Sequence, residues 1–189
     1  MSLARARALA IVGILVIAAL ILVVTAVVKD KQSRASYANG GCGAGQVAIS
    51  VKLPNPDKIK IRIFNGTGTA TGDKKNPISG ANPGLANRVA DDFKNRTFII
   101  DKVEDHPEKF DHVAKLHFGP KTVGASYVVR AYFLDETDDG GFDLKYNDDA
   151  VEVTLGNGFK QLGTKTEVNQ KIAQLGIPSP PPGTCNNGQ

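Results

Sequence analysis

The sequence has no Trp, one Met and only two Cys, and aromatic residues make up 6% of it. Two cysteines allow at most one internal disulfide, which excludes a disulfide-dense scaffold. The composition, with 41% apolar and 22% charged residues, excludes collagen-like, coiled-coil and fully disordered classes. A length of 189 residues therefore predicts one folded domain with appendages.

The main part of the chain also lacks a net charge. The formal charge of +4 comes entirely from residues before position 35, and basic and acidic residues are equal in number over 35–189. A neutral domain has no electrostatic footprint for a phosphate backbone, so no nucleic-acid partner is expected. The basic excess flanks an apolar segment, where it would meet anionic lipid headgroups.

The apolar segment, residues 8–28, contains 21 consecutive residues without a charge. At about 1.5 Å per residue, a helix of this length crosses the hydrocarbon core. The apolar core of a cleaved signal peptide spans about 7–15 residues, so a retained single-pass anchor is favoured over cleavage. We therefore expect a tail at 1–7, a transmembrane helix at 8–28 and a flexible tether at 29–56 that contains a possible short strand.

The cysteines decide the predicted orientation of this anchor, because its two flanks carry nearly equal numbers of basic residues. Cys42 and Cys185 flank the domain in Gly-, Pro- and Asn-rich surroundings. Such a pair suits a disulfide formed in an oxidising compartment, with two free thiols as the alternative. We expect the amino terminus to be cytoplasmic and residues 29–189 to be extracytoplasmic.

Hydrophobic periodicity predicts a strand, helix, strand, strand, helix, strand order, followed by a short helix. In residues 58–64, Ile alternates with Lys or Arg, which is typical of a strand with one buried and one wet face. Asn82 and Pro83 are the expected N-cap and first residue of the first helix. Right-handed crossovers then predict a two-layer α/β domain over 57–175, a ferredoxin-like α-β plait with a four-stranded mixed or antiparallel sheet, followed by a Pro-rich tail at 176–189.

Few residues have the spacing of a chemical site. The spacing of His106, His112 and His117 does not place two imidazoles on one helix face, and no metal site or cofactor is expected. The turn 65–68 resembles a fragment of a phosphate-binding turn, but no P-loop Lys-Ser/Thr pair follows, which favours a structural turn over a phosphate site. The acidic loop 135–149 lacks the EF-hand order, which favours solvated charges over a loose calcium site.

Two motifs carry a family resemblance. The strand ends in Asn65, Gly66, Thr67 and Gly68, and a later helix begins Gly84, Leu85, Ala86 and continues with Val89 and Ala90. These motifs, with the late segment 155–159, resemble the LytR C-terminal domain family of actinobacterial envelope proteins. The anchor and the cysteine near the carboxyl end are similar to the layout of an envelope integrity protein in that family.

The resemblance implies a non-catalytic protein that supports cell-wall or membrane integrity by binding a wall polymer or an envelope protein. A weak ligand surface is expected at Asn65, Gly66, Thr67 and Gly68 with Arg88, because backbone N–H groups near a helix start bind anionic or sugar groups. Two alternatives remain open. One is a membrane scaffold that acts through its anchor, and the other is an enzyme, such as a hydrolase, that uses the acidic loop with or without a metal.

The predicted topology is testable in intact cells. A membrane-impermeant amine-reactive biotin reagent is expected to label lysines within 29–189, because that part lies outside the membrane. Mass spectrometry of the recovered peptides measures the labelling, and permeabilised cells give the maximal yield. Recovery of no labelled peptide from the carboxyl half of intact cells would contradict the topology.

Overall fold

A computed structural model of the chain describes residues 17, 19, 42–70, 78–79, 82–106, 109–138 and 141–187. Residues from Cys42 to Asn187 form one compact unit. The predicted tail 1–7, the tether up to residue 41 and the span 8–28 lie outside the described residues, except for the helical Ile17 and Ala19. Among the residues described, no helix is both long and apolar enough to cross a membrane.

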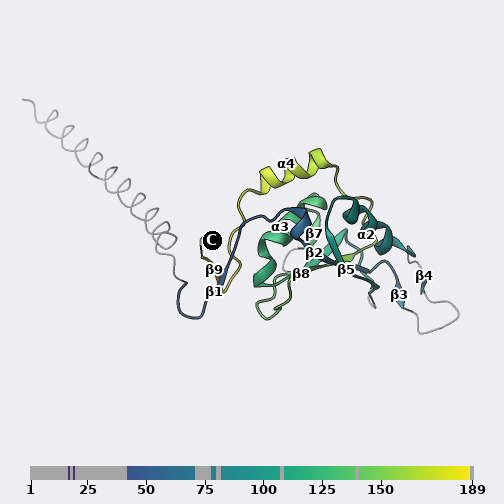
Figure 1. Cartoon of the computed structure of the whole chain (residues 1–189), viewed down its shortest axis with the longest axis horizontal. Coiled ribbons are helices and arrows are strands. Elements are labelled where there is room, and N and C mark those ends of the chain that lie inside the picture. Colours follow the sequence, from purple (N-terminus) through teal and green to yellow (C-terminus); the bar gives the residue numbers. More distant parts are fainter. Residues whose placement is uncertain are drawn as a thin grey trace, which may run out of the picture. The chain divides into compact units, whose positions relative to one another are not determined.

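A five-stranded mixed sheet lies at the centre of the compact unit (Figure 1). Its strand order, from the hydrogen-bonded pairs, is β5-β2-β8-β6-β7. β2 is parallel to both of its neighbours, β5 and β8. β6 is antiparallel to β8 and parallel to the short β7. The bounds are β2 Lys60–Asn65, β5 Ile99–Asp105, β6 Ala114–His117, β7 Thr137–Asp138 and β8 Ala150–Leu155.

Two helices, α2 (Leu85–Asn95) and α3 (Val123–Tyr132), pack on one face of this sheet. Alternation explains this packing: Ile61 and Ile63 are fully buried, whereas Arg62 between them is only half-buried on the opposite face. Phe93 of α2 is central to the core, with its ring 5.0 Å from that of Phe98. The expected two-layer arrangement with one wet sheet face is confirmed.

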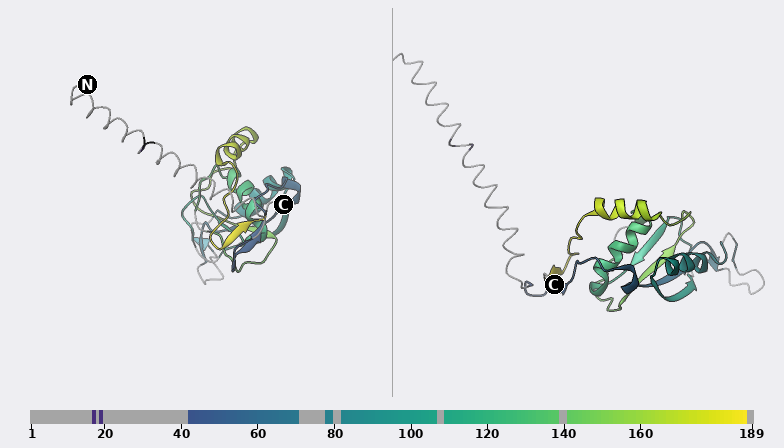
Figure 2. Two further views of the ribbon diagram at one scale, coloured as in Figure 1. Left: turned by 90° about the vertical axis from the view of Figure 1, so that its left-hand side faces the viewer. Right: turned by 45° about the horizontal axis from the view of Figure 1, so that its top comes forward.

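A third helix, α4 (Lys165–Leu175), lies against α3 rather than against the sheet (Figures 1 and 2). Its amino terminus is the predicted capping box. Glu167 Oε2 accepts from Thr164 N at 2.7 Å, and Thr164 Oγ1 accepts from Glu167 N at 3.4 Å. The hydrogen bonds from Thr164 lower the pKa of Glu167. The other described elements are short: β1 Val47–Ile49, η1 Pro56–Lys58, β3 Thr69–Ala70, β4 Ile78–Ser79, η2 Pro120–Thr122 and β9 Thr184–Asn186.

The strand order corrects the expected ferredoxin-like plait. In a split βαβ unit, another strand lies between the two strands that a helix connects. Here β2 and β5, which α2 connects, are direct hydrogen-bonded neighbours, and β7 adds a fifth strand. Alternation fixes which face of a strand is buried but leaves its lateral neighbours open, so the sequence pattern fits both orders.

The expected cap of α2 is also wrong by two residues. Gly84, with φ of 73°, is the N-cap, and Leu85 is the first helical residue. Asn82 does not cap the helix with its side chain. Its backbone carbonyl accepts from Leu85 N at 3.1 Å, and its side-chain oxygen accepts from Arg88 at 2.6 Å. The left-handed backbone conformation explains why glycine occupies the cap position.

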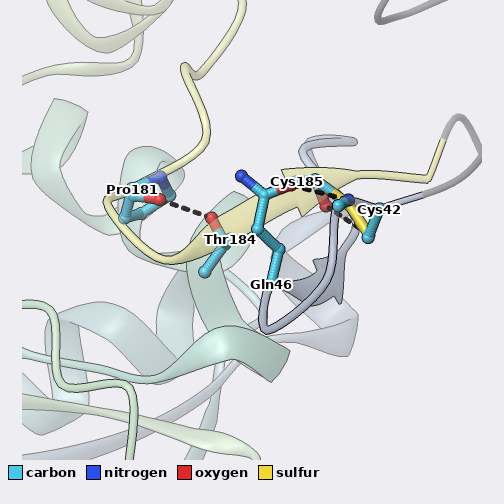
Figure 3. The surroundings of a disulfide bond; sticks show 6 residues. Cys42, Gln46, Pro181, Thr184 and Cys185 are labelled. Carbon is cyan, nitrogen blue, oxygen red and sulfur yellow. Dashed lines mark hydrogen bonds between the residues drawn. A yellow bond between two sulfur atoms is a disulfide. The ribbon is translucent and has the colours of Figure 1, made fainter.

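The described segments before β2 and after α4, which we call the two arms, are joined to each other (Figure 3). Cys42 and Cys185 form the predicted disulfide, with a Cα–Cα distance of 5.6 Å. β1, which confirms the predicted strand in this region, pairs in parallel with β9, and Thr184 Oγ1 donates to the Pro181 carbonyl at 2.7 Å. Ile49 and Val51 pack against Val123. The compact unit therefore extends beyond the expected 57–175 on both sides.

Removal of the disulfide tests the contribution of the arms to stability. The double variant Cys42→Ser/Cys185→Ser is expected to lose about 4–5 kcal/mol at most in the chain-entropy model, because the closed loop spans a sequence separation of 143. Urea unfolding followed by circular dichroism measures the loss. Wild-type protein under a reducing agent is the matched control and should shift equally; unchanged stability in both samples would contradict the expectation.

Candidate functional site

The carboxyl ends of β2, β5 and β8 meet at one edge of the sheet because these strands are parallel. Ligands of α/β sheets commonly bind at this end of the strands. The edge carries Asn65 from β2, Asp105 from β5 and the turn after Leu155 of β8, and α2 begins beside it. The predicted turn 65–68 therefore lies where a ligand is expected.

Asn65 is 4% exposed, and its side chain is fully hydrogen-bonded. Its Nδ2 donates to the Asn82 carbonyl and to Asp105 Oδ1, both at 3.2 Å. Its Oδ1 accepts from Thr67 N at 3.3 Å and from Thr67 Oγ1 at 2.7 Å. These bonds join the end of β2, the segment before α2 and the end of β5. They leave no side-chain donor of Asn65 for a ligand.

Gly66 and Thr67 are also committed to the fold. Gly66 N donates to the Leu155 carbonyl at 2.8 Å, and Gly66 O accepts from Phe110 N at 2.7 Å. A Cβ at Gly66 would lie 2.9 Å from the Leu155 carbonyl oxygen, so this close approach requires glycine. Thr67, 2% exposed, accepts from Asn82 N at 2.9 Å. The turn is thus a buried structural corner.

Arg88 reaches the same segment from the first turn of α2. Its guanidinium is exposed and donates to Asn82 Oδ1 at 2.6 Å and to the Pro83 carbonyl at 3.1 Å. Asn82 therefore connects Arg88 with Asn65 and Thr67 in one hydrogen-bond network. The structure brings the five predicted ligand-binding positions together, and ligand binding by Gly68 and Arg88 stays a prediction.

The acidic loop is largely paired with basic side chains. Asp148 and Asp149 contact Arg62 and Lys60, each at 2.6 Å, and Asp135 pairs with Arg130. Asp139 lies outside the described residues. Within the described ranges, no group of three or more His, Cys, Asp or Glu side chains is placed to hold a metal ion. The loop carboxylates at 148–149 therefore act as counterions of β2.

Arg62 is the centre of this ion-pair cluster on the open face of the sheet, the face that α2 and α3 do not cover. Its guanidinium contacts Asp101 and Asp148 at 2.6 Å, which raises its own pKa and lowers that of Asp148. Burial, followed by the nearby Glu152, raises the pKa of Tyr146 to about 12. Tyr146 is therefore a neutral phenol at physiological pH.

A shallow cavity of about 340 Å³ lies on the open face beside this cluster; we call it the open-face pocket. Its floor comes from outward-pointing residues of β2, β8 and β6, and its wall from His106, Lys109 and Phe110. Sequence reasoning missed it, because the outward strand positions converge only once the strand order is known. The lining residues are Phe64, His106, Lys109, Phe110, Lys115, His117, Glu152 and Thr154.

A second groove, of about 770 Å³, lies between the arm at 53–56 and the three helices. Tyr132 lines it, with the Arg96 guanidinium 5.3 Å from the ring centroid. Burial raises the pKa of Tyr132. Arg96 also donates to the Gly163 carbonyl at 2.6 Å, so it holds the segment before α4. The surface of this groove is slightly more apolar than that of the open-face pocket.

A comparison with known protein families finds a match over the sheet and the site described above. A family model described as "LytR cell envelope-related transcriptional attenuator" covers residues 58–159, which is more than half of the chain. The chain belongs to the LytR C-terminal domain family. The matched range begins just before β2 and ends after β8, so it includes the whole sheet, the turn 65–68 and the open-face pocket.

One solved structure matches part of this chain: the soluble domain of a conserved hypothetical secreted protein from Mycobacterium marinum. The identity is 18%, the TM-score is 0.49, and the match covers 69% of this chain and 82% of that chain. Among curated proteins, none matches the sequence. The family assignment therefore rests on the LytR C-terminal domain match.

The role of Asn65 as a structural corner is testable with Asn65→Asp. The variant loses two donors and places a buried carboxylate beside Asp105, so the free energy of unfolding should fall by about 3 kcal/mol at pH 7. Burial and Asp105 should raise the pKa of the new carboxyl in the folded state. The loss should therefore be small near pH 4 and grow as the pH rises through that pKa. Urea unfolding at several pH values measures it.

Asn157→Asp is the matched control for this experiment. Asn157 is exposed and also donates to a carboxylate, Asp111 Oδ1, at 2.8 Å. Because water solvates both groups there, the change should cost less than about 1 kcal/mol. Equal effects of the two substitutions would show that burial of the Asn65 network contributes nothing.

Proposed function

We propose that this protein is a membrane-anchored, extracytoplasmic member of its family that supports cell-envelope integrity. In this proposal, the anchor at 8–28 holds the domain at the outer side of the cell membrane. The domain binds an envelope component, either a wall polymer or a protein, and does not itself catalyse a reaction. The LytR C-terminal domain match is the observation that carries the proposal, because the family's description refers to the cell envelope.

Two further observations support this proposal. The disulfide between Cys42 and Cys185 suits a compartment that oxidises thiols. The open-face pocket gives the domain a concave surface with aromatic and charged side chains, a combination typical of binding sites. The loop carboxylates that an enzyme would need are engaged as counterions of Arg62 and Lys60, which favours binding over catalysis.

Deletion of the gene tests the proposal. Cells without the protein are expected to become more sensitive to antibiotics that act on the envelope, because a component that supports the wall or membrane is missing. The measurement is the minimal inhibitory concentration, with a ribosome-directed antibiotic as the control for general fitness. Restoration by the full chain is required. Unchanged sensitivity to every envelope-directed antibiotic would contradict the proposal.

A chimera separates the domain from the anchor. Replacement of residues 8–28 by an unrelated single-pass helix keeps the extracytoplasmic domain at the membrane. If the domain carries the function, the chimera should restore resistance in the deletion strain. Failure of a well-expressed chimera would instead assign the function to the anchor as a scaffold.

A further inference from the structure

We propose that the open-face pocket binds a sugar unit that carries a carboxylate. The proposal deepens the function given above and depends on it for the envelope as the source of the ligand. The site is distinct from the predicted corner at 65–68.

The strand register places an aromatic, a hydroxyl and a basic side chain next to one another. Thr154 of β8 is the direct partner of Phe64 on β2 and of Lys115 on β6. Neighbouring strands are about 4.8 Å apart, and these positions all point to the open face. A row of ring, hydroxyl and ammonium therefore forms the floor. Glu152 and His117, which are also direct partners, lie in the next row.

Lys115 is the cation of this row that a ligand would neutralise. The other outward-pointing cations of the sheet's centre, Lys60 and Arg62, contact Asp149 and Asp148. Among the residues that the structure describes, Lys115 makes no ion pair; its register partner on β7 is Asp138, whose carboxylate contacts His112 Nδ1 at 3.6 Å. Glu152 contacts His117 Nδ1 at 3.0 Å and Arg62 at 3.6 Å, so its charge is already engaged. An anionic group in the pocket would complete the charge pairing of Lys115.

The pocket wall favours a ring over a small inorganic anion. Phe110 comes from the segment before β6, and the imidazole of His106 lies edge-on to Phe64 with 6.3 Å between the ring centroids. Aromatic rings offer a flat apolar surface to the C–H face of a sugar, and Thr154 offers a hydroxyl to its polar edge. A volume of about 340 Å³ is at the small end of ligand pockets and suits one or two sugar rings.

Two disaccharides that differ in one lactyl ether group, which carries the carboxylate, test the proposal. N-acetylglucosaminyl-N-acetylmuramic acid carries a lactyl carboxylate, and N,N′-diacetylchitobiose has similar rings without it. The full chain in non-glycosidic detergent micelles is titrated with each probe by calorimetry. The acidic disaccharide is expected to bind about tenfold more tightly, which is the lower range for one hydrogen bond to a charged group.

Three variants assign this preference to the pocket. Lys115→Gln should abolish the difference between the two probes, because the ammonium is removed. Phe64→Leu should weaken both probes by a similar factor, because the stacking surface is lost. Lys58→Gln is the control, since Lys58 is exposed and precedes the opposite end of β2. It should behave as the wild type. Circular dichroism and the unfolding temperature verify that each variant is folded.

Equal or absent binding of the two probes by the wild type would overturn the proposal, as would a retained preference in a folded Lys115→Gln variant. The outcome is separable from that of the proposed function. If deletion sensitises cells but the acidic disaccharide does not bind, the pocket assignment fails and the envelope function stands. If the disaccharide binds as expected but deletion changes no sensitivity, the function fails and the site stands.

Discussion

The buried amide of Asn65 is the interaction on which the geometry of the sheet edge depends. It joins β2, the segment before α2 and β5 through four hydrogen bonds, and each buried group left without a partner would cost about 1–3 kcal/mol. The bonds explain why a glycine-rich turn of this kind keeps one conformation. They also explain why a motif that looks like a ligand-binding turn is a structural corner here.

The two faces of the sheet differ in composition: one is part of the apolar core, and the other carries charged side chains. One face packs Ile61, Ile63 and Val153 beneath α2 and α3. The other face keeps charged side chains in water, and the loop before β8 neutralises Arg62 and Lys60 at one end of it. That pairing leaves the open-face pocket, with Lys115 in its floor, as the part of the face that remains available to a partner.

The two arms pair with each other through β1 and β9 and through one disulfide. β1 and β9 are three residues each, and a pair this short is marginal without further support. The disulfide and the contacts of Ile49 and Val51 with Val123 supply that support. Such a clasp resists the opening of the compact unit at its two ends.

The sequence by itself determined the local elements, because their periods and caps depend on near neighbours. The wet and buried faces of β2, the Thr164–Glu167 capping box, the arm strand and the family motifs were all predictable in this way. The pairing of Cys42 with Cys185 was predictable from their number and their flanking positions.

Tertiary structure alone decided the lateral order of the strands, the fifth strand and the shift of the α2 cap from Asn82 to Gly84. It also decided that Phe64, Thr154 and Lys115, which are far apart in the sequence, share one row. Strand alternation specifies a face but no neighbour, and the backbone of Asn82 is held by Asn65 and Thr67 at the end of β2, which are far from it in the sequence. Such choices depend on long-range contacts, which a local pattern does not encode.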